Sequence, residues 1–191
     1  MLAPERFLDE LLELYRTRGG ASYGEGVSQI THALQCGLLA VRAGADAEAV
    51  TAALLHDVGH LLAAEGEDAA ERGLDTRHEV LGARWLGRAF GPRVRAAVRW
   101  HVEAKRYLCR LELDYSQQLS TASQLSLRLQ GGVMGEAEAA AFAARPYAER
   151  AVQLRLWDDQ AKDPTLATPE MDYFRPQLRA ALALAPYRDQ A

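Results

Sequence analysis

Apolar side chains recur along this chain mostly at intervals of three and four residues, the spacing that gathers them on one face of an α-helix. Alternation with a period of two, which would indicate strands, is nearly absent from the sequence. We therefore predict helices over residues 7–15, 30–41, 46–58, 76–86, 92–102, 116–129, 136–144, 147–157 and 171–184. This pattern predicts an all-α fold.

Residues that favour helix ends stand at several of these boundaries. Gly44 follows the second predicted helix as a C-cap, and Asp46 precedes the third as an N-cap. Residues 76–79 have the spacing of a capping box. The pair Gly91 and Pro92 ends one helix and begins the next, because proline is tolerated at the first helical position.

Composition and charge exclude several classes of protein. With 191 residues, 49% of them hydrophobic, the chain can bury one sizeable core, and no linker rich in serine, proline or glycine divides it. We therefore expect a single domain over residues 1–191. The net charge of -4 argues against nucleic acid as a partner. No apolar stretch approaches the about 20 residues of a membrane span, and the first residues are too charged for a secretory signal, so we expect a cytoplasmic protein without a membrane partner.

An imidazole and a carboxylate stand side by side at the end of a strongly apolar run, at His56 and Asp57. An unpaired buried charge is costly, so such a pair is expected to hold a metal or a partner. Three further histidines and a late aspartate lie on other predicted helices. The candidate metal ligands are His32, His56, Asp57, His78, His101 and Asp158.

The types of these side chains indicate which metals the site would suit. Neighbouring residues on a helix point about 100° apart, but the donor atoms of His56 and Asp57 can still converge on one ion or on two ions a few Å apart. Imidazole and carboxylate ligands without thiolate suit iron, manganese or zinc. A single histidine such as His32 or His78 is more often a hydrogen-bonded helix residue than a metal ligand, and a lone His-Asp pair is also consistent with a surface ion pair. The joint pattern favours a metal centre, and the spacing leaves open whether it holds one metal or two.

The chain resembles the HD-domain proteins, a metal-dependent superfamily named for its His-Asp pair. Within this superfamily it is most similar to small diiron oxygenases that cleave the carbon-phosphorus bond of 1-hydroxyphosphonates, typified by 2-amino-1-hydroxyethylphosphonate dioxygenase and its trimethylammonio counterpart. The strings at residues 105–107 and 130–132 are more particular to this subgroup than the His-Asp pair. The matching stretches are residues 27–36, 52–60, 101–108, 119–123, 129–134 and 155–158. The resemblance implies a single HD-domain helical bundle.

The resemblance also implies a role for each candidate ligand. One iron would be held by His32, His56, Asp57 and Asp158, and the other by Asp57, His78 and His101. Glu25 would occupy the second iron until substrate displaces it. Tyr23 stands two residues before Glu25, whereas the family pattern has a tyrosine three residues before this glutamate, which leaves the role of Tyr23 and the choice of substrate open.

A second group of residues falls where the family binds the phosphonate. These residues are His60, Lys105, Ser123, Ser126 and Arg155. A phosphonate dianion requires fixed cations and hydroxyl donors, and Lys105 and Arg155 supply an ammonium and a guanidinium group. A solvated surface charge is the usual state of lysine and arginine side chains. For Arg155 this alternative is weaker, because Arg155 stands three residues before Asp158 and therefore on nearly the same face of a helix.

The activity implied by the resemblance is oxidative. With an Fe(II)/Fe(III) pair and dioxygen, the enzyme would convert 2-amino- or 2-trimethylammonio-1-hydroxyethylphosphonate to phosphate and glycine or glycine betaine. Two other functions remain open: a metal-dependent phosphohydrolase acting on a nucleotide or another phosphomonoester, and a module that binds a small anion without catalysis. His78 and Glu25 favour the oxygenase, since they suggest a second metal with a displaceable ligand.

Overall fold

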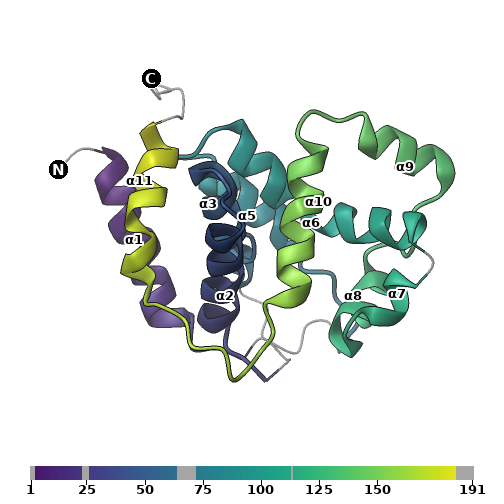
Figure 1. The fold of residues 1–191 in the computed structure, drawn as a ribbon, viewed down its shortest axis with the longest axis horizontal. Helices are drawn as coiled ribbons and strands as arrows, with labels where there is room; N and C mark the ends of the chain where they lie inside the picture. The colour runs from purple at the N-terminus through teal and green to yellow at the C-terminus, as the bar shows by residue number, and fades with distance from the viewer. Residues whose placement is uncertain (1–2, 23–25, 64–71, 113, 184–191) are drawn as a thin grey trace.

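The protein folds as a bundle of α-helices, which confirms the all-α fold predicted from the sequence (Figure 1). The structure is a computed structural model and describes residues 3–22, 26–63, 72–112 and 114–183, which contain no strand. Its helices are α1 (Ala3–Arg18), α2 (Gln29–Arg42), α3 (Ala47–Leu55), α4 (Val58–Leu62), α5 (His78–Leu86), α6 (Pro92–Leu111), α7 (Tyr115–Gln118), α8 (Thr121–Leu129), α9 (Glu136–Ala143), α10 (Ala148–Gln160) and α11 (Arg175–Ala183), with a 3-10 turn η1 (Met171–Phe174) before α11. Within these ranges every helix is too short or too polar to cross a membrane.

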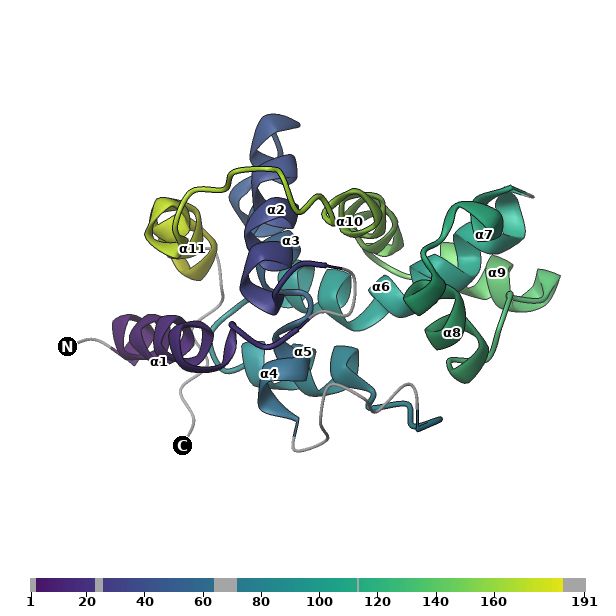
Figure 2. The same cartoon turned by 90° about the horizontal axis from the view of Figure 1, so that it is seen from below.

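The helix α6 connects the two ends of the molecule. Its 20 residues pack against α3, α5 and α10 and continue to α7 and α9. The helices α7, α8 and α9 gather at one end of the molecule, and α1 and α11 lie at the other (Figure 2). The middle of the bundle is therefore the region where helices from the whole length of the chain meet.

The main hydrophobic core lies between α1, α2, α3, α5 and α11. Among its fully buried side chains are Leu11, Leu54, Leu86, Phe174 and Leu178. Burial of one such side chain contributes roughly 1.5–3 kcal/mol to stability. Two smaller clusters of buried apolar side chains lie in the part of the bundle that contains α7, α8 and α9. This arrangement fixes the helices that surround the candidate site.

Three of the predicted helix boundaries are confirmed. Gly44 follows α2 with a φ of +69°, a conformation that glycine adopts without strain. The side chain of Asp46 accepts a hydrogen bond from the backbone N–H of Ala49 at 2.8 Å and caps α3. Pro92 occupies the first turn of α6 after Gly91.

The prediction of one continuous helix over residues 46–58 is wrong. The helix α3 ends at Leu55, and α4 begins at Val58. Asp57 stands between them with φ -97° and ψ 10°, the sparsely populated bridge region where active-site residues are often found. The His-Asp pair therefore lies at a junction of two helices, and its side chains are not bound to the 100° spacing of a single helix.

Two further boundaries differ from the prediction. The capping box at residues 76–79 does not form, because α5 begins at His78 and the carboxylate of Asp75 instead accepts a hydrogen bond from the backbone N–H of Arg77. The predicted helix over residues 116–129 is divided into α7 and α8. The hydroxyl of Ser120 caps α8 by accepting from the backbone N–H of Ser123 at 3.1 Å. Because of this division, α8 runs in a different direction from α7. The helix α8 carries Ser123 and Ser126.

Candidate metal centre

The six predicted metal ligands converge on one buried place in the middle of the bundle. His32 comes from α2, His78 from α5 and His101 from α6, while the His-Asp pair stands at the junction of α3 and α4. The donor atoms form two groups in which every atom lies within 4.8 Å of the others. One group contains His32, His56 and Asp57, and the other contains Asp57, His78 and His101.

Asp57 belongs to both groups and stands between them. Its Oδ2 atom lies 3.7 Å from Nε2 of His32 and 3.3 Å from Nε2 of His56. Its Oδ1 atom lies 3.3 Å from Nε2 of His78 and 3.5 Å from Nε2 of His101. The two oxygens of one carboxylate thus face two different pairs of histidines, which is the arrangement that a bridging ligand requires.

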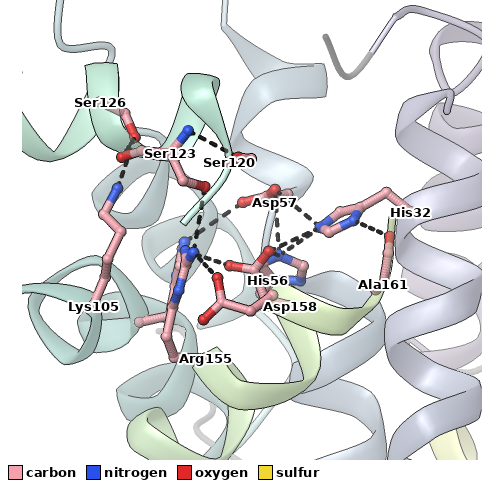
Figure 3. A network of polar contacts seen from close by, with 12 residues as sticks. His32, His56, Asp57, Lys105, Ser120, Ser123, Ser126, Arg155, Asp158 and Ala161 are labelled. Carbon is pink, nitrogen blue, oxygen red and sulfur yellow. Dashed lines mark hydrogen bonds and ion pairs between the residues drawn. The ribbon is translucent and has the colours of Figure 1, made fainter. Parts of the chain in front are cut away.

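Asp158 joins the first of these groups from α10. Its Oδ1 atom lies 3.3 Å from Nε2 of His32 and 3.8 Å from Nε2 of His56 (Figure 3). Its Oδ2 atom accepts a hydrogen bond from Nη1 of Arg155 at 2.6 Å. One oxygen of Asp158 therefore faces the histidines while the other is held by a cation.

The orientation of the histidines is set by backbone carbonyls. The Nδ1 atoms of three of them lie 2.7–2.9 Å from carbonyl oxygens: His32 from Ala161, His56 from Ala53 and His101 from Val98. A carbonyl can only accept, so each Nδ1 atom carries the proton and donates it. The Nε2 lone pairs therefore point inward, as metal ligation by imidazole requires.

This geometry is a test of whether the site fits a metal. The Nε2 atoms of His32 and His56 lie 3.2 Å apart, and two lone pairs at this distance repel unless a metal ion or a proton lies between them. Burial raises the pKa of Asp57, but His56 and His78 lower it more strongly, so its pKa stays well below the usual range. Burial lowers the pKa of His56, but Asp57 and Cys36 raise it well above the usual range, so a proton or a metal ion is favoured between the ring nitrogens. The inward Nε2 atoms and the anionic carboxylate thus suit a cation. This donor set suits iron, manganese or zinc.

The contact between α4 and α5 brings His78 to this centre. Gly59 and Gly82 face each other there, and a Cβ atom on Gly59 would lie 1.9 Å from the carbonyl oxygen of His78. Only glycine allows the two backbones to approach this closely. The glycine two residues after Asp57 is therefore required by the packing of α4 against α5.

His60 extends the centre by stacking on a candidate ligand. Its ring lies 3.9 Å from the ring of His78, with an angle of 19° between the two planes. Burial and the neighbouring His78 lower the pKa of His60 to about 3. His60 is therefore neutral at physiological pH and can offer a hydrogen bond, but not a positive charge, to an anion.

Four of the predicted phosphonate-binding residues form a second group beside Asp158, in which Lys105, Ser123 and Arg155 are buried and Ser126 is half-buried. Nζ of Lys105 donates to Oγ of Ser126 at 2.7 Å, and Nη2 of Arg155 donates to Oγ of Ser123 at 3.4 Å (Figure 3). Lys105 and Arg155 are 2% and 4% exposed, so the reading of these cations as solvated surface charges is wrong. We call the group of Lys105, Ser123, Ser126 and Arg155 the cation-serine pocket.

Residues 30–159 match the HD domain family. This range contains all six candidate ligands. The chain is 42% identical over 183 residues to the hydroxymethylphosphonate dioxygenase of Gimesia maris, an alignment that covers 94% of this chain and 90% of the relative. The chain belongs to the HD-domain phosphonate dioxygenases.

Two other relatives extend this comparison. The 1-hydroxy-2-(trimethylamino)ethylphosphonate dioxygenase (glycine-betaine-forming) of Leisingera caerulea is 36% identical over 167 residues, which cover 87% of this chain and 85% of the relative. An uncharacterised protein of Acanthamoeba polyphaga mimivirus is 30% identical over 171 residues, covering 88% and 78% of the two chains. The dioxygenases of Gimesia maris and Leisingera caerulea are named for different phosphonates. The carbon that carries the hydroxyl group has no further carbon substituent in the first and carries a trimethylaminomethyl group in the second.

The strings at residues 105–107 and 130–132, which carry part of the family resemblance in the sequence, meet in space. Nε of Arg106 donates to the carbonyl of Gly132 at 2.8 Å, and its Nη2 atom lies 3.4 Å from the carbonyl of Gly131. Nη1 of Arg106 also pairs with Glu138 at 2.7 Å. Arg106 thereby ties the end of α8 to α6, next to Lys105, and keeps the serines of α8 beside that ammonium group.

We expect the alanine substitution of Gly131 to destabilise the protein more than that of Gly132. Gly131 has a φ of +100°, and a Cβ atom there would lie 3.3 Å from the Arg106 guanidinium, whereas Gly132 has a φ of +69° and nothing within 4 Å. We expect losses in the free energy of unfolding of roughly 2–3 kcal/mol for Gly131→Ala and about 1 kcal/mol for Gly132→Ala, measured by urea denaturation. Equal losses would show that the contact with Arg106 does not constrain this loop.

Arg155 has a wider set of partners than the sequence indicated. Its guanidinium pairs with Asp158 and Asp159, and Nε donates to the hydroxyl of Tyr115 at 3.3 Å. Tyr115 in turn donates to Asp159. Sequence reasoning missed Tyr115 and Asp159, although the spacing of four residues between Arg155 and Asp159 is a signal for a helical ion pair. Arg155 therefore orients the Asp158 carboxylate in addition to contacting Ser123.

Two predicted site residues, Tyr23 and Glu25, lie outside the residues that the structure describes. Their assignment as the displaceable ligand and its partner stays a prediction.

Proposed function

We propose that this protein catalyses the oxygen-dependent cleavage of the carbon-phosphorus bond of a small 1-hydroxyphosphonate, with release of phosphate and a carboxylic acid. The observation that carries this proposal is the position of Asp57 between two pairs of histidines, directly beside a pocket of buried cations and serine hydroxyls. The names of two relatives support the proposal, because both are dioxygenases that act on hydroxyphosphonates.

We further propose that the centre holds two iron ions. His32, His56, Asp57 and Asp158 would hold one ion, and Asp57, His78 and His101 the other. Bound iron would supply the activation of dioxygen, which no amino-acid side chain provides. Asp57 and Asp158 would balance its charge, and the backbone carbonyls behind three of the histidines hold the Nε2 atoms in the direction that ligation would require.

The cation-serine pocket would bind and orient the phosphonate. Lys105 places an ammonium group at the phosphonate oxygens, and the hydroxyls of Ser123 and Ser126 offer hydrogen bonds beside it. His60, being neutral, contributes a hydrogen bond. Because the bond to carbon is broken and phosphate leaves, these groups also stabilise the charge that develops on the departing phosphate.

The proposal is tested by a panel of substrates on the iron-loaded protein. We expect hydroxymethylphosphonate, 2-amino-1-hydroxyethylphosphonate and its trimethylammonio analogue to give phosphate release matched by oxygen uptake, with none released when oxygen is excluded. If Glu25 attracts the cationic group of the larger substrates, Glu25→Ala raises the KM for these and leaves that for hydroxymethylphosphonate unchanged. Phosphate release from phosphomonoesters without oxygen uptake would instead support the phosphohydrolase.

We expect phosphonate binding to weaken as the pH rises through about 7. Burial, together with Arg155, lowers the pKa of Lys105 to about 7, so the ammonium form that binds an anion is lost above this pH. The variant Lys105→Arg keeps its charge throughout. The quantity to follow is the ratio of two dissociation constants for inorganic phosphate, that of wild type divided by that of Lys105→Arg. We expect this ratio to rise by up to about tenfold per pH unit above about 7.

Isothermal titration calorimetry between about pH 6 and about pH 9 measures this ratio. The ionisation of phosphate itself affects both proteins equally and cancels. A ratio that does not change with pH would show that Lys105 remains charged in the pocket.

A further inference from the structure

Lysine is rare in this chain and occurs only beside the candidate site. Of the 22 lysine and arginine residues, two are lysines, Lys105 and Lys162. Nζ of Lys105 lies 2.7 Å from Oγ of Ser126, and Nζ of Lys162 lies 3.2 Å from Oγ of Ser123. Both ammonium groups therefore reach serine hydroxyls on the same helix, α8. An ammonium group is a compact point charge, unlike the planar guanidinium group used elsewhere in this chain.

The backbone around Lys162 is held against α2. The carbonyl of Ala161 accepts a hydrogen bond from Nδ1 of His32 at 2.8 Å. Gln35, which is fully buried, donates from Nε2 to the carbonyl of Asp163 at 2.5 Å and accepts from the backbone N–H of Asp163 at 3.1 Å. Both neighbours of Lys162 are thus tied to the helix that carries His32, and the approach of its side chain to α8 is fixed from that side.

Lys105 and Arg155 alone do not balance the charge of a phosphonate dianion. Arg155 also contacts the Ser123 hydroxyl, but its guanidinium pairs with the carboxylates of Asp158 and Asp159, so much of its charge is already balanced. The pKa of Lys105 is lowered by burial first, and then by Arg155, with a smaller effect of Lys162. The position of Lys162 agrees with this effect, because its Nζ atom and Nη2 of Arg155 donate to the same Ser123 hydroxyl. A phosphonate dianion carries two charges, which one lysine does not balance.

We propose that Lys162 is a second ammonium group of the cation-serine pocket, that it binds the phosphonate together with the Ser123 hydroxyl, and that Gln35 positions it. This inference rests on the proposed function, because it assigns a residue to the binding of the phosphonate substrate. The ligand class is an oxyanion of phosphorus, either the substrate phosphonate or the phosphate product.

The small number of lysines allows a direct footprinting test. Besides the N-terminal amine, only Lys105 and Lys162 react with an amine-selective acylating reagent, and mass spectrometry resolves their peptides. On iron-loaded protein without oxygen, we expect saturating hydroxymethylphosphonate or inorganic phosphate to slow the labelling of Lys162 about tenfold and to leave the N-terminal amine unchanged. Unchanged labelling of Lys162 would overturn the proposal.

Substitution gives an independent measure. We expect Lys162→Ala to raise the KM for the phosphonate about 10- to 100-fold with the iron content unchanged, the size expected for a lost charge-assisted hydrogen bond, and Lys162→Arg to restore part of it. The matched control is Arg128→Ala, which removes an exposed cation from the same helix and should leave the KM unchanged. A KM of wild-type size in Lys162→Ala would contradict the proposal.

The same amine-labelling experiment tests whether Gln35 positions Lys162. In Gln35→Met, which keeps the size of the side chain, we expect phosphate still to protect Lys105 but no longer to protect Lys162. Loss of protection at both lysines would mean that Gln35 supports the fold in general and would overturn its positioning role. If wild type consumes no oxygen with any hydroxyphosphonate, the proposed function fails, while protection of Lys162 by phosphate remains a separate result.

Discussion

Replacing Asp57 by alanine is expected to remove both metal ions and to lower kcat/KM for the phosphonate by about a thousandfold or more. The two oxygens of Asp57 face two different pairs of histidines, so its loss deprives both groups of the carboxylate that balances the metal charge. His78, by contrast, belongs to one of the two groups only. We therefore expect His78→Ala to lose one metal ion and to keep the other.

Metal analysis of the purified variants, prepared without oxygen, measures this expectation. Asp172→Ala is the matched control, since it removes an exposed carboxylate paired with Arg175 and should leave the metal content unchanged. One ion retained at wild-type affinity in Asp57→Ala would contradict the bridging position of this residue.

Replacing Gly59 by alanine is expected to lower the free energy of unfolding by about 3 kcal/mol or more and to weaken metal binding at the second group. The added Cβ atom would lie 1.9 Å from the carbonyl oxygen of His78, so α4 and α5 must move apart. Asp57 and His78 lie on opposite sides of this contact, so their separation increases with it.

Thermal denaturation and metal titration of the variant test this effect. Gly20→Ala is the control, because a Cβ atom at Gly20 meets nothing within 4 Å. If Gly59→Ala matches the stability and metal content of Gly20→Ala, the glycine contact does not determine the position of His78.

The sequence predicted the starts of two helices that surround the site, because a capping residue and the apolar spacing agree there. Asp46 and Pro92 mark the starts of α3 and α6 in the sequence as they do in the structure. The break at the His-Asp pair was not predictable from the pattern, because the apolar spacing continues without interruption from Val50 to Val58. The break arises from tertiary packing around the centre, which local periodicity does not encode.

The candidate ligands were predictable from residue type and order, and their convergence was implied by the family resemblance. Their orientation was not, because it depends on backbone carbonyls such as those of Ala161 and Val98, whose positions no residue type reveals. The position of Lys162 was hidden for a similar reason. It depends on hydrogen bonds between Gln35 and Asp163, which stand 128 residues apart in the chain.

The hydrogen bond between His32 and the carbonyl of Ala161 spans 129 residues. During synthesis on the ribosome, the early histidines emerge long before Asp158 in α10 and the carbonyl of Ala161 just after it. A growing chain that ends before α10 has nitrogen ligands but lacks both the second carboxylate and the group that orients His32. We therefore expect metal to be captured by the finished protein, after release, and not by the nascent chain.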